Sequence, residues 1–292
     1  MDKKLTFIVP DDCDKMLALS FLKHNCNLSS RMITRLKREK DGILMNGKIL
    51  RTIDFVSKGS KVEINLPNEK STILPIKGEV DVLFEDKHLI IVNKPPRMPV
   101  HPVKEHQTDT LANIITYYAM QKGENYVFRA INRLDKDTSG IVIIAKDRFT
   151  ANSLKTEIFK KYYAICHGRV EQNGTIDKPI GLTENSIIVR HVCSDGQPAI
   201  THYKVLKTFS NISLLELTLE TGRTHQIRCH MSNIGYPLLG DDLYGGQLDI
   251  ITRQALHCGY AEFVHPVSKQ KVIINSQLPS DMKNILDAKK ED

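Results

Sequence analysis

Asp135 is the residue whose surroundings in the sequence most clearly suggest a role in a reaction. Residues 131–140 (INRLDKDTSG) combine an arginine with several turn-forming residues, and the apolar run of residues 141–146 follows directly. A carboxylate beside a buried strand costs free energy unless it is paired or takes part in a reaction. A structural ion pair with an arginine therefore explains Asp135 as well as a nucleophilic role does.

A second carboxylate, Asp137, lies two residues further along the chain. Together the two residues suggest the paired carboxylates of a glycosidase, which stand on opposite sides of a sugar. Side chains two residues apart on an extended chain point the same way, so this pair does not flank a substrate. A single nucleophilic aspartate, Asp135, is the chemical interpretation that remains.

An arginine at the start of a helix is the second feature of chemical interest. Residues 214–219 predict a strand and Thr221-Gly222 a turn. The i, i+4, i+7 spacing of three apolar residues from Ile227 onward then predicts a helix that Gly235 ends. Arg223 thus lies at a strand-to-helix turn, where a guanidinium and helix amides can hold an anion together. The alternative is a surface arginine without such a role.

Possible metal ligands occur on the same predicted helix. His225 and Cys229 share a face and His230 follows, but no carboxylate or third ligand has compatible spacing. The six cysteines, at positions 13, 26, 166, 193, 229 and 258, include no Cys-x-x-Cys pair. The sequence therefore predicts no metal site, and thiols that are idle in a reducing compartment.

Composition and charge limit the class of protein. With 292 residues, 41% of them hydrophobic and 26% charged, the chain suits a soluble globular protein of one or two domains. No apolar run approaches the ~20 residues that span a bilayer. Residues 1–5 do not resemble a signal peptide, so we expect a cytoplasmic protein without membrane contact. The net charge of +7 favours a polyanionic partner.

Residues 1–66 are predicted to form a small module. Residues 14–25 suit one helix, and a second runs from the N-cap Ser29 to about Lys40. On this second helix three arginines recur at i, i+4, i+7, and no acidic residue stands four positions from the first of them. Such a face suits phosphate contacts, although a solvated helix face is the alternative. The three residues are Arg31, Arg35 and Arg38.

A hairpin and a linker follow these helices. Asn46-Gly47 within residues 42–50 is a strong hairpin signal, and residues 61–64 alternate as a strand does. Two helices edged with arginine and a short hairpin resemble the RNA-binding module of the S-four type, carried here by residues 28–50 (LSSRMITRLKREKDGILMNGKIL). Residues 67–78 are polar, contain two prolines and lack periodicity, so they are predicted to be a linker.

The motifs beyond the linker resemble the RluA-type family of RNA pseudouridine synthases. The segment NRLDKDTSGIVIIAK matches the family pattern, except that Asn132 replaces a histidine. The Pro-Pro-Arg at 95–97 and Cys258 also depart from the usual residues. The other segments appear in family order: IIVNKPPRMPVHP, KKYYAICHG, LETGRTHQIRCHMSNIGYPLLGDDLYGG and LHCGYAEFVHP.

The resemblance implies a fold and a reaction. The fold is α+β, a mixed and largely antiparallel sheet with a central cleft, expected over residues 79–285 and followed by a tail at 286–292. The reaction breaks the bond between ribose and uracil, turns the base and rejoins it through carbon 5, without cofactor or metal. Asp135 would attack the ribose to form a covalent intermediate, or remove a ribose proton to give a glycal.

The resemblance also assigns roles to further residues. Tyr162 matches the active-site tyrosine that stacks on the base. Arg223 matches the residue expected to pair with Asp135 and keep it ionised. Leu256 would form an apolar wall, and Arg133 would fill the space that the extruded uridine leaves.

The expected partner is structured RNA, with large-subunit ribosomal RNA as first choice and tRNA as second, bound by a monomer. Two other classes are weighed against the enzyme. A non-catalytic RNA-binding or ribosome-assembly protein need not retain Asp135, Tyr162 and Arg223 together. A nucleosidase would need a second positioned carboxylate.

Overall fold

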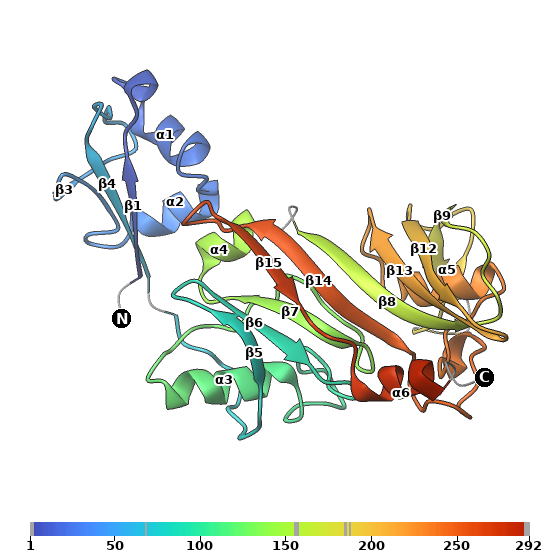
Figure 1. Ribbon diagram of the computed structural model, residues 1–292. Coiled ribbons are helices and arrows are strands. Elements are labelled where there is room, and N and C mark those ends of the chain that lie inside the picture. The colour runs from blue at the N-terminus through green and yellow to red at the C-terminus, as the bar shows by residue number, and fades with distance from the viewer. Residues whose placement is uncertain (1–2, 68, 155–157, 184–185, 187, 289–292) are drawn as a thin grey trace.

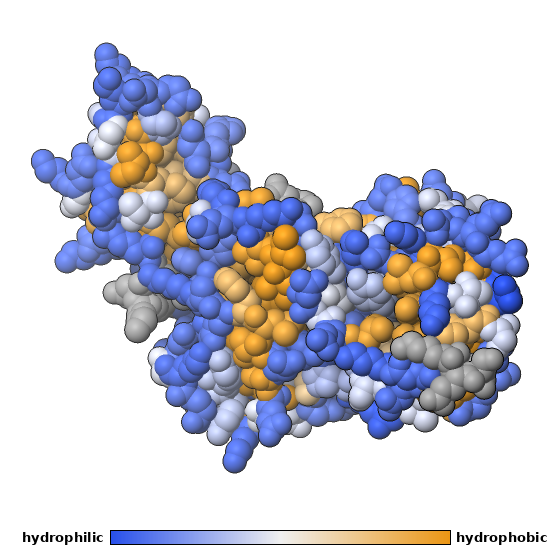
Figure 2. Space-filling model, in the orientation of Figure 1, coloured by the Kyte–Doolittle hydropathy of each residue, from blue (hydrophilic) through white to orange (hydrophobic). Residues whose placement is uncertain are grey.

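The computed structural model describes residues 3–67, 69–154, 158–183, 186 and 188–288, arranged as two lobes (Figure 1). In the space-filling view polar residues cover most of the visible N-terminal lobe, whereas apolar side chains gather over the central strands of the large sheet (Figure 2). Within the described residues no helix combines the length and the apolar character that a membrane span needs.

The N-terminal lobe is a four-stranded sheet with two helices and a core of its own. Phe21, Leu22 and Ile64 are fully buried there, so the lobe has its own hydrophobic stabilisation. The predicted hairpin forms at Asn46-Gly47, where both residues take positive φ (51° and 80°). The sheet order is β1-β4-β2-β3, from β1 (Lys3–Ile8), β4 (Lys61–Leu66), β2 (Ile43–Met45) and β3 (Lys48–Ile49), with helices α1 (Ala18–His24) and α2 (Ser30–Leu36).

Both N-terminal helices are shorter than the sequence predicts. Residues 14–17 lie outside α1 because Lys15 takes a left-handed conformation (φ 61°) after a short 3-10 turn. The predicted cap of α2 is confirmed, since the Ser29 hydroxyl accepts a hydrogen bond from the Met32 amide at 3.2 Å. This helix ends at Leu36 rather than Lys40 because the chain folds back onto it. A Cβ at Gly42 would lie 2.1 Å from the Leu36 carbonyl oxygen.

The second lobe is built on a nine-stranded sheet. Its neighbouring strands are antiparallel except for β7 and β14, which are parallel, so the predicted mixed and largely antiparallel sheet is confirmed. The path is β5-β6-β7-β14-β8-β13-β12-β9, with β15 paired to β14. The strands are β5 (Asp81–Glu85), β6 (Leu89–Lys94), β7 (Ser139–Ala145), β8 (Phe159–His167), β9 (Gly174–Asp177), β12 (Ile200–Thr208), β13 (Ile212–Leu219), β14 (Leu256–Val264) and β15 (Lys271–Asn275).

Helices and a small hairpin sheet surround this large sheet. Every residue of β7 is buried, which makes it the centre of the core beside Asp135. The helix at the C-terminal end runs to Ala288, so residues 286–288 of the predicted tail are helical, and residues 289–292 lie outside the described residues. The remaining elements are α3 (Leu111–Gln121), α4 (Arg148–Ser153), α5 (Gln226–Asn233), α6 (Ser280–Ala288), β10 (Ile180–Leu182) and β11 (Arg190–Val192).

The two lobes are joined through the segment predicted as a linker. The carboxylate of Glu69 pairs with Arg35 of α2 (2.6 Å), with Arg148 of α4 (2.5 Å) and with Arg129. Phe149 of α4 packs into the N-terminal core, against Phe7. Residues of the linker therefore fix the N-terminal lobe against the second lobe.

Replacing Glu69 with Gln should loosen this junction. The loss of one charged partner from a partly buried cluster costs about 1–3 kcal/mol, which corresponds to roughly a fivefold to 150-fold increase in local opening. Protease cleavage within residues 67–78 should accelerate by a similar factor if cleavage follows local opening. Glu79→Gln, an exposed residue at the end of the same segment, serves as the control. Equal cleavage rates in both variants would mean that Glu69 does not hold the lobes together.

Candidate active site

A cleft of about 880 Å³ lies above the central strands and contains Asp135. One wall is the loop of residues 130–136, and another is the turn of residues 219–224. Tyr162 of β8 and Lys160 contribute to the lining, and an adjoining recess adds His225, Arg228 and Leu256 around the same carboxylate. The sequence analysis named Asp135, Tyr162 and Leu256 among these residues, and the fold brings them together from distant segments.

The loop that carries Asp135 is held by buried polar contacts. At its start, the Asn132 amide donates to the Ile141 carbonyl and accepts from the Ile143 amide, both at 2.9 Å. The residue that replaces the family histidine therefore ties the loop to β7. Beyond Asp135, the guanidinium of Arg253 donates to the Asp137 carbonyl at 3.1 Å and pairs with Asp281 of α6 at 2.7 Å.

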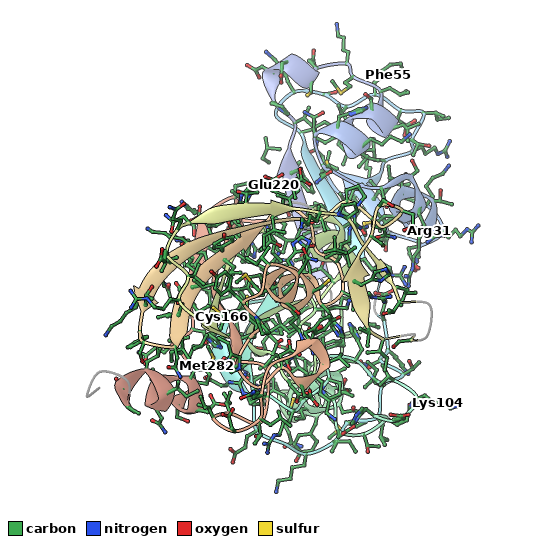
Figure 3. All side chains as sticks on the ribbon, turned by 90° about the vertical axis from the view of Figure 1, so that its right-hand side faces the viewer. Arg31, Phe55, Lys104, Cys166, Glu220 and Met282 are labelled. Carbon is green, nitrogen blue, oxygen red and sulfur yellow. The ribbon has the colours of Figure 1, made fainter. Side chains whose placement is uncertain are left out.

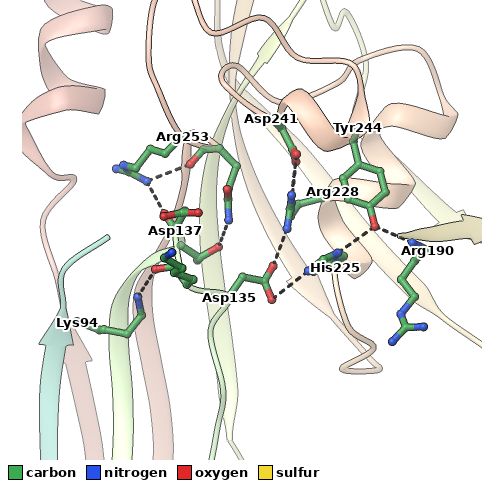
Figure 4. Close-up of polar contacts among 12 residues, drawn as sticks. Lys94, Asp135, Asp137, Arg190, His225, Arg228, Asp241, Tyr244 and Arg253 are labelled. Atoms are coloured by element: carbon green, nitrogen blue, oxygen red, sulfur yellow. Dashed lines mark hydrogen bonds and ion pairs between the residues drawn. The ribbon is translucent and has the colours of Figure 1, made fainter. Parts of the chain in front are cut away.

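Lys94 supports the same loop from inside the protein. Its side chain is fully buried, and Nζ donates to the carbonyl oxygens of Pro95, Met98 and Lys136 at 2.8–2.9 Å. The Lys136 carbonyl directly follows Asp135 in the chain, so the ammonium fixes the backbone next to the carboxylate (Figure 4). Burial lowers the pKa of Lys94 to about 7, against the favourable charges of Asp137 and Asp135.

Replacing Lys94 with Met tests this support through pH. Because the folded pKa lies below the value of 10.5 for a free lysine, the unfolded chain binds more protons between about pH 7 and pH 10. Wild-type stability should therefore rise with pH over that range, relative to the variant, by up to about 1.4 kcal/mol per pH unit. Urea unfolding of both proteins from pH 6.5 to 9.5 measures the difference, and parallel curves would contradict a buried titrating lysine.

Asp135 lies between a guanidinium and an imidazole (Figure 4). Its Oδ2 is 3.4 Å from Arg228 NH1, and its Oδ1 is 3.9 Å from His225 Nε2. Arg228 also makes a bidentate pair with Asp241, at 2.7 and 2.8 Å, and lies over the ring of Tyr244. The cation beside Asp135 is thus held in place by a second, fully buried carboxylate.

The predicted pairing of Arg223 with Asp135 is wrong, because Arg228 takes that place. The chain bends at His225, which is left-handed (φ 56°), and α5 begins only at Gln226. Arg223 precedes the bend, and its Nε donates to the Pro198 carbonyl at 3.1 Å. The turn amide of Arg223 does not bind an anion either, since it donates to Gln226 Oε1 at 3.0 Å. Arg223 is an exposed residue of the cleft wall.

Tyr162 and Leu256 face the site from neighbouring strands. Tyr162 on β8 is buried and lies opposite Cys258 on β14, whose thiol its hydroxyl contacts. Burial raises the pKa of Tyr162 well above the ordinary value, so its hydroxyl is protonated at neutral pH. Leu256 is buried in the recess beside Asp135, as an apolar wall requires. Arg133 is exposed and lines both the cleft and the recess.

Sequence reasoning missed several residues of this arrangement, among them His225. Arg228, Asp241, Tyr244 and Lys94 all lie in the quoted family segments, yet none has a spacing that points to Asp135. A signal was present in residues 240–244 (GDDLY), where two acidic residues follow the apolar pair at 238–239 after a single glycine. Among the described residues, no three His, Cys, Asp or Glu side chains are grouped as a metal site would require.

Comparisons with known proteins agree with this geometry. Residues 88–233 match the RNA pseudouridylate synthase family. The uncharacterized RNA pseudouridine synthase YhcT of Bacillus subtilis is 43% identical over 240 residues, covering 79% of this chain and 80% of that protein. The ribosomal large subunit pseudouridine synthase D of Buchnera aphidicola (Schizaphis graminum) is 36% identical over 296 residues, covering 94% and 92%.

A solved structure shows the same likeness. Human RNA pseudouridylate synthase domain containing 4 superimposes with a TM-score of 0.58 at 25% identity, covering 72% of this chain and 93% of that chain. The fold and the motifs define an RNA-modifying isomerase. The chain belongs to the RNA pseudouridine synthase family, which confirms the resemblance inferred from its sequence motifs.

Proposed function

We propose that this protein converts uridine to pseudouridine in large-subunit ribosomal RNA, with Asp135 as the reacting carboxylate. The observation that carries the choice of RNA is the extent of similarity to ribosomal large subunit pseudouridine synthase D. It spans 94% of this chain and therefore includes most of the N-terminal lobe. Substrate choice depends on contacts outside the catalytic cleft, so a likeness in both lobes favours the same class of RNA.

The arrangement of the cleft fits the reaction. Whether Asp135 attacks the ribose or removes a ribose proton, it must be close to the sugar, and the guanidinium of Arg228, 3.4 Å away, holds its carboxylate in the cleft. The ring of Tyr162 offers a face on which uracil can stack, and its protonated hydroxyl is a proton donor. Leu256 forms the apolar wall of the recess beside Asp135. Arg133, at the rim, fills the space that the extruded base leaves in the RNA stack.

Mapping pseudouridines in total RNA, with and without this protein, tests the choice of substrate. Loss of a site in large-subunit ribosomal RNA upon deletion, and its return with the wild-type gene, is the expected result. Loss confined to tRNA would identify the second choice. An unchanged map would favour the non-catalytic RNA-binding alternative.

The N-terminal lobe is proposed to bind phosphates through the arginines of α2. Arg31 is exposed and extends away from the lobe (Figure 3), and Arg38 lies just beyond the helix end. Neither forms an ion pair within the described part of the chain. Arg35, by contrast, pairs with Glu69 of the linker segment. One of the three arginines that were predicted to be unpaired therefore has an acidic partner.

Replacing Arg31, Arg35 and Arg38 with Gln should weaken RNA binding and its dependence on salt. Each phosphate contact contributes about 0.7–0.9 to the slope of log affinity against log salt. We expect a loss of about one to two units, because two of the three arginines form no ion pair with the residues that the structure describes. Turnover at saturating RNA should change little, since the cleft is intact.

A matched control changes basic residues far from this surface. Arg169→Gln with Lys283→Gln removes exposed charge, and Lys283 is on α6, at the other end of the molecule from α2 (Figure 1). Salt titrations of all three proteins on one RNA separate a local effect from net charge. Equal slopes for wild type and the triple variant would mean that the three arginines are only a solvated helix face and bind no phosphate.

A further inference from the structure

Asp135 has a second neighbour that the family motifs did not suggest. The imidazole of His225 lies with Nε2 3.9 Å from Oδ1 of Asp135, while Arg228 faces Oδ2. His225 takes a left-handed backbone conformation (φ 56°, ψ 20°) at the start of α5. Residues other than glycine rarely adopt this conformation, although His tolerates it better than most. The bend directs the ring into the recess beside Asp135.

Hydrogen bonds on the far side of the ring determine which nitrogen carries the proton (Figure 4). The Tyr244 hydroxyl oxygen accepts from the Arg190 backbone amide at 2.9 Å and lies 3.0 Å from His225 Nδ1. In the described part of the chain, Nδ1 is the acceptor within reach of the hydroxyl proton. Tyr244 therefore donates to Nδ1, which leaves the proton of a neutral imidazole on Nε2.

The charge of the ring favours the same arrangement. Burial lowers the pKa of His225, and the guanidinium groups of Arg228 and Arg190 lower it further, against Asp135 and Asp241. The imidazole is therefore neutral at pH 7. Burial also raises the pKa of Tyr244 to about 12, so its hydroxyl retains the proton that it donates.

We propose that His225 is a positioning residue for the isomerisation, held by Tyr244 in the tautomer that presents Nε2–H to Asp135. The inference rests on the proposed role of Asp135. A neutral donor on Oδ1 and a guanidinium on Oδ2 fix the rotation of the carboxylate. His225 keeps its proton, and no bond forms or breaks at the ring.

The distance and the support of this contact suit such a role. A movement of about 1 Å upon substrate binding would bring the pair to ordinary hydrogen-bond distance, as polar contacts of unliganded active sites often require. One short segment supports both neighbours of the carboxylate. Asp241 holds Arg228, and Tyr244 lies under Arg228 and holds His225.

Three variants separate the donor from the fold. Tyr244→Phe keeps the ring beneath Arg228 and removes only the hydroxyl. His225→Asn suits the left-handed backbone but is too short to reach Asp135, whereas His225→Gln keeps an N–H donor at about the original reach. We expect kcat to fall about tenfold in Tyr244→Phe and about thirtyfold or more in His225→Asn. His225→Gln should remain within about fivefold of wild type, and RNA dissociation constants within about twofold.

Nitrogen-15 spectra of the imidazoles in the full chain provide the direct readout. The signal that His225→Gln removes should show protonated Nε2 in wild type, and a mixture of tautomers in Tyr244→Phe. Protonated Nδ1 in wild type, or full kcat in His225→Asn, would overturn the proposal. If one of these two results is found and Asp135→Asn is inactive, only the role of His225 is rejected. If Asp135→Asn is active, the proposed function itself fails.

Discussion

Replacing Asp135 with Asn should reduce pseudouridine formation by a factor on the order of 10⁴ or more, as the loss of a reacting group commonly does. The amide has the same shape but is a poor nucleophile and base. RNA affinity should stay within about twofold, since binding is distributed over many phosphate contacts. The unfolding midpoint should also change little, because Asp135 is partly exposed and its partner Arg228 retains Asp241. Tritium release from RNA labelled at uridine carbon 5 measures the reaction directly.

The neighbouring carboxylate supplies a matched control. Asp137→Asn removes the same charge two residues away, and it leaves intact the Asp137 carbonyl that Arg253 binds. We expect this variant to keep activity within a few fold of wild type. Full activity of Asp135→Asn, or equal losses in both variants, would mean that Asp135 has no special chemical role.

The sequence predicts the site best where local pattern determines the structure. The apolar run after Asp135 predicts β7. The placement of Tyr162 and Leu256 in one cleft was implied only by the resemblance to the family, and both line the recess beside Asp135. Contacts over long sequence separations do not leave such a pattern. Strand β1 is stabilised by pairing with β4, about 60 residues away, and was not predicted. Glu69 pairs with Arg35 from outside the helix, beyond the reach of any i, i+4 rule.

Side-chain direction at a turn is the second limit of sequence reasoning. Arg223 and Arg228 flank one bend, and their order in the chain does not reveal which of them faces Asp135. The left-handed backbone at His225 decides this, because it starts α5 at Gln226 and directs Arg228 toward the cleft. Nothing in the residue types around position 225 requires that conformation.

Replacing Arg228 with Ala should be the second most damaging change to activity. It removes the cation beside Asp135 and leaves Asp241, which is 1% exposed, as a buried charge without its bidentate partner. Breaking a buried pair in this way costs about 3–5 kcal/mol of stability. We expect kcat to fall about a thousandfold.

Two further variants separate chemistry from stability. Arg228→Met combined with Asp241→Leu removes both buried charges, so much of the stability should return while activity stays low. Arg223→Ala, at the exposed arginine of the cleft wall, should lower turnover by less than about tenfold. Stopped-assay rates and urea unfolding measure both effects. If Arg223→Ala lowers kcat as far as Arg228→Ala does, Arg223 must move to Asp135 when RNA binds.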